Sequence, residues 1–186
     1  MDTRTALLDS AESAVRSRGY DGFSYADLAI DVGIRKASVH HHFPAKRDLA
    51  IALVERYTER VMEGVTEAEQ TYPDAANRLR AFVATYRAAL DGGTKICLCA
   101  SFSLASESVD PAVLAKVNAF NEVATRWLAA TFALGRDDGT IAGVDEPGDD
   151  ARQCLAMLIG AQLLARAARD VTQFDGAMAR LATRLS

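Results

Sequence analysis

The sequence predicts an all-α protein with about nine helices, because apolar residues recur at three- and four-residue intervals through most of it. Hydrophobic residues make up 49% of the 186 positions and only four residues are proline, so long helices around a buried core are feasible. No series of alternating polar and apolar residues bounded by turns indicates a strand. The length of the chain fits either one ordinary domain or a small domain joined to a larger one.

The N-terminal segment is predicted to form an amphipathic helix. Its apolar positions are Leu7, Ala11, Ala14 and Val15, which share one helical face. Charges interrupt the segment and no apolar stretch in it is long, so neither a signal peptide nor a membrane span is indicated. A cytoplasmic protein is expected.

Residues 24–33 contain the signals of a short helix with defined ends. Ser24 can accept a hydrogen bond from the backbone N–H near Asp27, whose carboxylate can return the bond, so a helix is expected to begin at Tyr25. Gly33 follows at a position where a residue that tolerates positive φ ends a helix.

A second short helix is predicted between Gly33 and Pro44, since proline cannot continue a helix. Ile34, Val39 and Phe43 fall on one inward stripe. The other positions face outward or flank that stripe: Lys36, Ala37, Ser38, His40, His41 and His42. The outward face is therefore small, polar and cationic.

Positive charge is concentrated here, although the chain has a formal net charge of −4. Residues 35–47 contain Arg35, Lys36, Lys46 and Arg47, three histidines and no acid. A local basic patch is sufficient for phosphate binding, because each neutralised phosphate releases counterions at the contact. Lys46 and Arg47 fall in the first turn of the next predicted helix, from which both can reach a backbone phosphate.

The spacing of these residues resembles the pattern of the TetR/AcrR family of bacterial repressors. The matching positions are Ser24, Asp27, Leu28, Ala29, Gly33, Ile34, Ser38, Val39, His40, His41, His42, Phe43, Pro44, Lys46 and Leu49. The first predicted helix and its exit are also similar to the family pattern. The resemblance is strong over residues 1–50 and weak beyond them.

The resemblance implies a three-helix helix-turn-helix DNA-binding domain over residues 1–48, followed by a helical ligand-binding and dimerisation domain over residues 49–186. It implies a homodimeric repressor that binds a near-palindromic DNA operator and is released by a small-molecule effector. Expected DNA contacts are Ser24, Tyr25, His40, His42 and Lys46 for phosphates, Lys36, Ala37, Ser38 and His41 for base edges, and Arg35 for either.

Two residues depart from the family pattern. Arg35 stands where Ser or Thr is usual, so its helix lacks a hydroxyl cap, at a cost of about 1 kcal/mol. His40 stands where an aromatic residue is usual. If His40 becomes charged at the interface, DNA affinity should rise as the pH falls towards about 6.5. A binding constant that is flat from about pH 6 to pH 8 would contradict this hypothesis.

Apolar periodicity predicts the remaining helices. They are expected over residues 45–72, 77–90, 95–107, 111–132, 149–170 and 174–185, with Thr94 capping the third and Pro111 beginning the fourth. Residues 135–148 contain four glycines and several acids, which indicates a solvated loop rather than a metal site.

The resemblance also implies two sites in the larger domain. The expected ligand pocket is lined by Phe82, Tyr86, Cys97, Phe102, Ser103, Phe120 and Trp127. The helix over residues 149–170 is apolar on several faces and needs a second partner. The expected homodimer interface consists of Leu155, Leu158, Ile159, Gln162, Leu163, Phe174, Met178 and Leu181. For both sets the alternative is ordinary hydrophobic core.

Cys97 is a candidate reactive thiol, because a helix N-terminus and the neighbouring Lys95 would favour its thiolate. Some family members sense oxidants or electrophiles through a cysteine at a similar place, so a cysteine-based sensor repressor is an alternative function. The other interpretation is that Cys97, Cys99 and Cys154 are small buried hydrophobes in a reducing cytosol.

Catalytic and metal sites are not indicated. The three histidines are consecutive and diverge by about 100° on a helix, so they cannot jointly bind one metal. The sequence contains no GxSxG, HExxH or P-loop motif, so we expect neither an enzyme nor a cofactor. A helical protein that uses these helices only for protein contacts is the remaining alternative.

Overall fold

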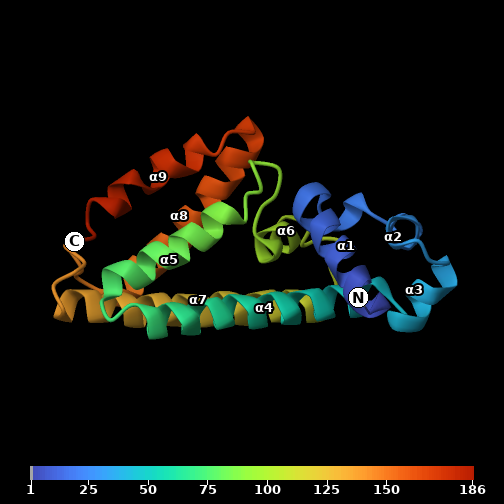
Figure 1. Ribbon diagram of the computed structural model, residues 1–186, viewed down its shortest axis with the longest axis horizontal. Coiled ribbons are helices and arrows are strands. Elements are labelled where there is room, and N and C mark those ends of the chain that lie inside the picture. Colours follow the sequence, from blue (N-terminus) through green and yellow to red (C-terminus); the bar gives the residue numbers. More distant parts are fainter. Residues whose placement is uncertain (1) are drawn as a thin grey trace. The chain divides into compact units, whose positions relative to one another are not determined.

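The computed structural model describes residues 2–186, which form helices joined by turns and loops (Figure 1). Its elements are α1 (Thr3–Arg18), the 3₁₀ helix η1 (Tyr20–Gly22), α2 (Tyr25–Val32), α3 (Lys36–His42), α4 (Lys46–Thr71), α5 (Ala75–Ala88), α6 (Leu98–Leu104), α7 (Pro111–Asp137), α8 (Pro147–Ala168) and α9 (Thr172–Ala182). An isolated antiparallel bridge joins Ile141 to Leu185. The all-α prediction is confirmed. Within residues 2–186, no helix combines the length and apolarity that crossing a bilayer requires.

The chain forms two compact units. The first contains residues 2–59 and Leu98–Ala119, and the second contains Arg60–Cys97 and Phe120–Ser186. The first unit is larger than the domain expected over residues 1–48, because it also includes α6 and the beginnings of α4 and α7. The boundary of the DNA-binding domain at residue 48 therefore stays a prediction.

The core of the first unit is built on the apolar face of α1. Leu7 and Val15 are fully buried there, as are Val39 of α3 and Leu49 of α4. The segment after α1 is held by α6, since Phe102 lies against the ring of Tyr20 at 5.6 Å between centroids. In addition, the Ser101 hydroxyl donates to the backbone carbonyl of Val15 (3.0 Å).

The ends of α2 follow the sequence signals. Ser24 Oγ accepts from the backbone N–H of Asp27, and the Asp27 carboxylate accepts in return from the backbone N–H of Ser24, which completes a capping box. Gly33 has φ 73° and ends the helix in the left-handed region. Both predicted ends of this helix are confirmed.

The second unit packs α8 against α9, with α5 beside them (Figure 1). Its fully buried side chains include Leu79, Phe132 and Leu158. Ile141 lies so close to α7 that a Cβ atom added to Gly135 would stand 2.3 Å from its side chain. A glycine is therefore required at position 135 for the loop after α7 to reach this core.

The helix predicted over residues 95–107 is shorter than expected. α6 begins at Leu98 and ends at Leu104. Thr94 does not cap it, because the Thr94 hydroxyl donates to the backbone carbonyl of Asp91 (2.8 Å) and closes a turn. Gly92 and Gly93 have positive φ in this turn, which delays the start of the helix.

Candidate nucleic-acid interface

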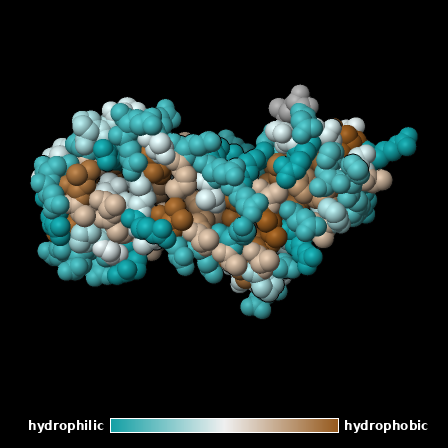
Figure 2. Space-filling model, turned by 90° about the horizontal axis from the view of Figure 1, so that it is seen from below, coloured by the Kyte–Doolittle hydropathy of each residue, from teal (hydrophilic) through white to brown (hydrophobic). Residues whose placement is uncertain are grey.

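The outward face of α3 is the candidate interface. Val39 and Phe43 are buried and hold the helix against the first unit, so the predicted inward stripe is confirmed for these two residues. Exposed on the opposite side are Arg35, Lys36, Ala37, His40 and His41, while Ser38 and His42 are half-buried. The end of this unit that carries α3 presents a mainly hydrophilic surface (Figure 2).

Two cations at the start of α3 remain available. Arg35 occupies the N-cap position without capping the helix through its side chain. Within residues 2–186, no carboxylate forms an ion pair with either Arg35 or Lys36. Since no carboxylate among these described residues neutralises either charge, both side chains can bind an external phosphate or a guanine edge.

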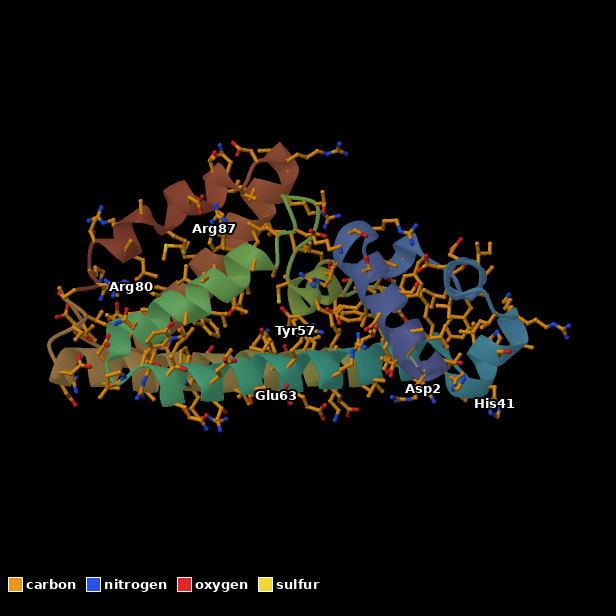
Figure 3. All side chains as sticks on the ribbon, in the orientation of Figure 1. Asp2, His41, Tyr57, Glu63, Arg80 and Arg87 are labelled. Atoms are coloured by element: carbon orange, nitrogen blue, oxygen red, sulfur yellow. The ribbon has the colours of Figure 1, made fainter. Side chains whose placement is uncertain are left out.

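The three histidines differ in their surroundings. His40 is partly fixed, because its Nδ1 lies 3.4 Å from the carbonyl of Pro44 and its ring meets that of Tyr25 edge-on. His41 lies at the outer edge of α3 (Figure 3), and its ring is 5.6 Å from that of His42. The described residues contain no cluster of three or more His, Cys, Asp or Glu side chains suited to a metal ion.

Lys46 does not occupy the position that the sequence suggested. Its ammonium group points into the first unit and donates to the backbone carbonyls of Tyr20 (2.7 Å) and Phe23 (2.9 Å). The same nitrogen lies 4.4 Å and 4.3 Å from the centroids of those two rings. Burial lowers the pKa of Lys46. The expected phosphate contact by Lys46 is thus not supported, because its ammonium group is held by two carbonyls and two aromatic rings of the protein.

Tyr25 and Ser24 are also committed to internal contacts. Tyr25 is buried, and its hydroxyl donates to the backbone carbonyl of Phe43 (2.9 Å). Burial, followed by the negative charge of Asp48, raises the pKa of Tyr25 to about 12. The Ser24 hydroxyl donates to the Asp27 carboxylate (2.8 Å), and these bonds lower the pKa of Asp27. The predicted phosphate contact by Tyr25 is therefore not supported, because its hydroxyl is bonded inside the protein. Ser24 is exposed, but its hydroxyl caps α2.

Arg47 and Arg4 supply positive charge near the same face. Arg47 has a side chain 62% exposed, with only long contacts to Asp48 (3.6 Å) and Asp110 (3.9 Å). Arg4, on α1, places its guanidinium carbon 5.2 Å from the ring centroid of Phe43. Sequence reasoning missed Arg4, because no local signal in the first helix indicates that its N-terminal turn meets the end of α3.

The residues predicted to line a ligand pocket are divided between the two units. Phe82 packs against Tyr86 (5.1 Å between centroids) and Trp127 (5.0 Å) in the second unit, where Phe120 is also buried. The indole N–H of Trp127 donates to Glu69 (2.9 Å). In contrast, Phe102 and Ser103 belong to α6 in the first unit. The assignment of these residues to one ligand pocket stays a prediction.

Cys97 lies in the interior, just before α6. Cys97 is only 1% exposed, and its backbone N–H donates to Oε1 of the fully buried Gln162 (2.8 Å). Nε2 of Gln162 in turn donates to the backbone carbonyl of Tyr86 (2.6 Å). Gln162 was predicted to face a second chain, but it joins α8 to the end of α5 and to the segment before α6.

Most of the predicted dimer interface is buried within one chain. The buried members are Leu155, Leu158, Gln162, Phe174, Met178 and Leu181. They form the packing between α8, α9 and α5, so they are not available to a second copy. Ile159 and Leu163 remain half-buried, and the neighbouring Leu164 is 62% exposed.

A short helix pair whose exposed Arg35 and Lys36 form no ion pair within residues 2–186 is typical of a helix-turn-helix DNA-binding protein. Residues 7–53 match the family described as bacterial regulatory proteins, tetR family. The chain is 26% identical to the HTH-type transcriptional repressor NemR of Escherichia coli, over 97% of this chain and 92% of that protein. It is 31% identical to the HTH-type transcriptional activator FasR of Mycolicibacterium smegmatis, over 46% of this chain and 39% of that protein.

The fold gives the same result. A TetR-family transcriptional regulator from Agrobacterium tumefaciens superposes with a TM-score of 0.93 at 30% identity, over 99% of this chain and 97% of that one. The chain belongs to the TetR family and is a DNA-binding transcriptional regulator.

Proposed function

We propose that this protein is a homodimeric repressor whose two α3 helices enter successive major grooves of a near-palindromic operator, about 34–36 Å apart. The observation that supports this is the exposed face of α3, where Arg35 and Lys36 carry charge that no carboxylate of residues 2–186 neutralises. A cationic helix face of small residues can approach the floor of the groove closely.

The exposed and half-buried residues fall into two groups, according to which part of the DNA each could contact. Lys36, Ala37, Ser38 and His41 lie along the face that would meet base edges, whereas His40, His42 and Arg47 flank it and suit phosphates. Arg35, at the helix start, can serve either role. Phosphate contacts hold the register of the protein on DNA, and base contacts select the sequence.

Selection from a random duplex library, followed by gel shifts at rising salt, tests this proposal. Lys36→Ala is expected to change which sequences are preferred, with a loss of about 1–3 kcal/mol of discrimination at one base pair. Arg18→Ala is the matched control, because Arg18 is exposed at the far end of α1. The proposal is wrong if no selected duplex binds more tightly than random DNA.

Homodimerisation is assigned to the outward side of α8. Ile159, Gly160 and Leu163 are half-buried and Leu164 is 62% exposed, which leaves an apolar stripe at helical spacing after α9 and α5 have covered the other side. Leu164→Glu is expected to yield a monomer in sedimentation velocity. Ile30→Glu, at a position 81% exposed in the first unit, should leave the dimer intact, and a dimeric Leu164→Glu would refute the assignment.

Repression rather than activation is proposed because the repressor NemR matches nearly the whole chain, whereas the activator FasR matches less than half of it. A small-molecule effector would act by binding one conformation of the dimer better than the other. A reporter controlled by the selected operator should gain expression when the protein is removed. Loss of expression on removal would instead indicate an activator.

A further inference from the structure

Arg4 lies where α1 meets the end of α3. It is the second residue of α1, is exposed, and places its guanidinium carbon 5.2 Å from the centroid of Phe43, the residue that ends α3. Figure 1 shows the N-terminal end of α1 beside the junction of α3 and α4. In Figure 3, Asp2 and His41 lie along the same edge of the first unit.

The charge of Arg4 is not neutralised within the described chain. Within residues 2–186, no carboxylate forms an ion pair with Arg4, whereas Arg16 on the same helix is paired with Glu12 (3.2 Å). Stacking on an aromatic ring restrains a guanidinium while leaving its N–H donors available. Arg4 is therefore held at the edge of the interface with its hydrogen-bonding groups unused by any carboxylate.

From this geometry we propose that Arg4 contacts a DNA backbone phosphate at the edge of the operator site, next to the groove that α3 enters. This inference rests on the proposed function. It also replaces a charge that the sequence had assigned to Lys46, whose ammonium group is held by Tyr20 and Phe23. A phosphate contact by Arg4 adds affinity for every sequence and no preference among them.

The test measures operator affinity by fluorescence anisotropy over a series of salt concentrations, using the full chain. Arg4→Gln is compared with Arg18→Gln, which removes the same charge from the same helix about 21 Å away. For Arg4→Gln the slope of log K against log salt should be smaller by about 0.9 for each protomer on the DNA. Near 0.1 M salt this corresponds to about eightfold weaker binding per protomer, and the difference should vanish near 1 M. Arg18→Gln should keep the full slope.

Arg4→Lys provides a second variant that retains the charge. It should keep the slope, which shows that loss of charge rather than misfolding explains the result for Arg4→Gln. An Arg4→Gln slope equal to that of the unaltered protein overturns the inference and leaves the proposed function standing. If the unaltered protein shows no preference for any duplex, then the proposed function fails and this inference fails with it.

Discussion

Lys46→Met separates an internal role for Lys46 from a DNA contact. The substitution keeps an unbranched side chain that can still pack on the rings of Tyr20 and Phe23, but it removes two hydrogen bonds of 2.7 Å and 2.9 Å to backbone carbonyls. A hydrogen bond to a charged group contributes about 1.5–3 kcal/mol, and the ring contacts add about 0.5–1 kcal/mol. Allowing for partial exposure, we expect a loss of about 3 kcal/mol, which lowers Tm by about 6–12 °C in a chain of this size.

Thermal unfolding followed by far-ultraviolet circular dichroism measures this loss. Operator binding, measured well below Tm, should keep the salt slope of the unaltered protein. Arg47→Met is the matched control, because Arg47 is the next residue in the sequence and its side chain is 62% exposed. It should leave Tm unchanged and reduce the slope by about 0.9 per protomer. A Lys46→Met protein that keeps the Tm of the unaltered protein but shows a smaller salt slope would show instead that Lys46 contacts DNA.

Three further outcomes are expected. Gln162→Leu removes two buried hydrogen bonds, to the Cys97 N–H and the Tyr86 carbonyl, and should cost about 3 kcal/mol, or about 6–12 °C in Tm. An unchanged Tm would contradict these buried contacts. Tyr25→Phe should cost about 1 kcal/mol in urea unfolding below pH 10. This difference should shrink as the pH rises above 10 and be lost before about pH 12, because the pKa of Tyr25 is raised to about 12 in the folded state only. Burial raises the pKa of Cys154 to about 12, and all three cysteines are buried, so Ellman's reagent should react only after unfolding; reaction of Cys97 in the folded protein would favour a thiol sensor.

Local signals in the sequence were sufficient to predict the helix-turn-helix pair. Ser24 and Asp27 are three positions apart, and Gly33 ends the helix through its own φ. Val39 and Phe43 are one helical turn apart and face the same way. Each of these features depends on residues within one turn of one another, so spacing alone specifies them.

The partners of the polar side chains could not be predicted in the same way. The Lys46 ammonium group contacts carbonyls 26 and 23 positions earlier, and Arg4 meets a ring on a different helix. Position on a helix shows that Lys46 begins α4 but not that η1 bends back beside it. The candidate interface was therefore predicted as a region, whereas the roles of its individual cations required the tertiary structure.

α8 shows the same limit for packing surfaces. Its apolar residues occupy several faces, and such a helix requires partners on more than one side. The sequence did not indicate which side the chain itself covers. In the structure, α9 and α5 cover the side that bears Leu158 and Gln162, where a buried amide is tolerated because it bonds both Cys97 and Tyr86. The side bearing Leu164 stays exposed in one chain, and burial of that apolar side against a second copy would remove it from water.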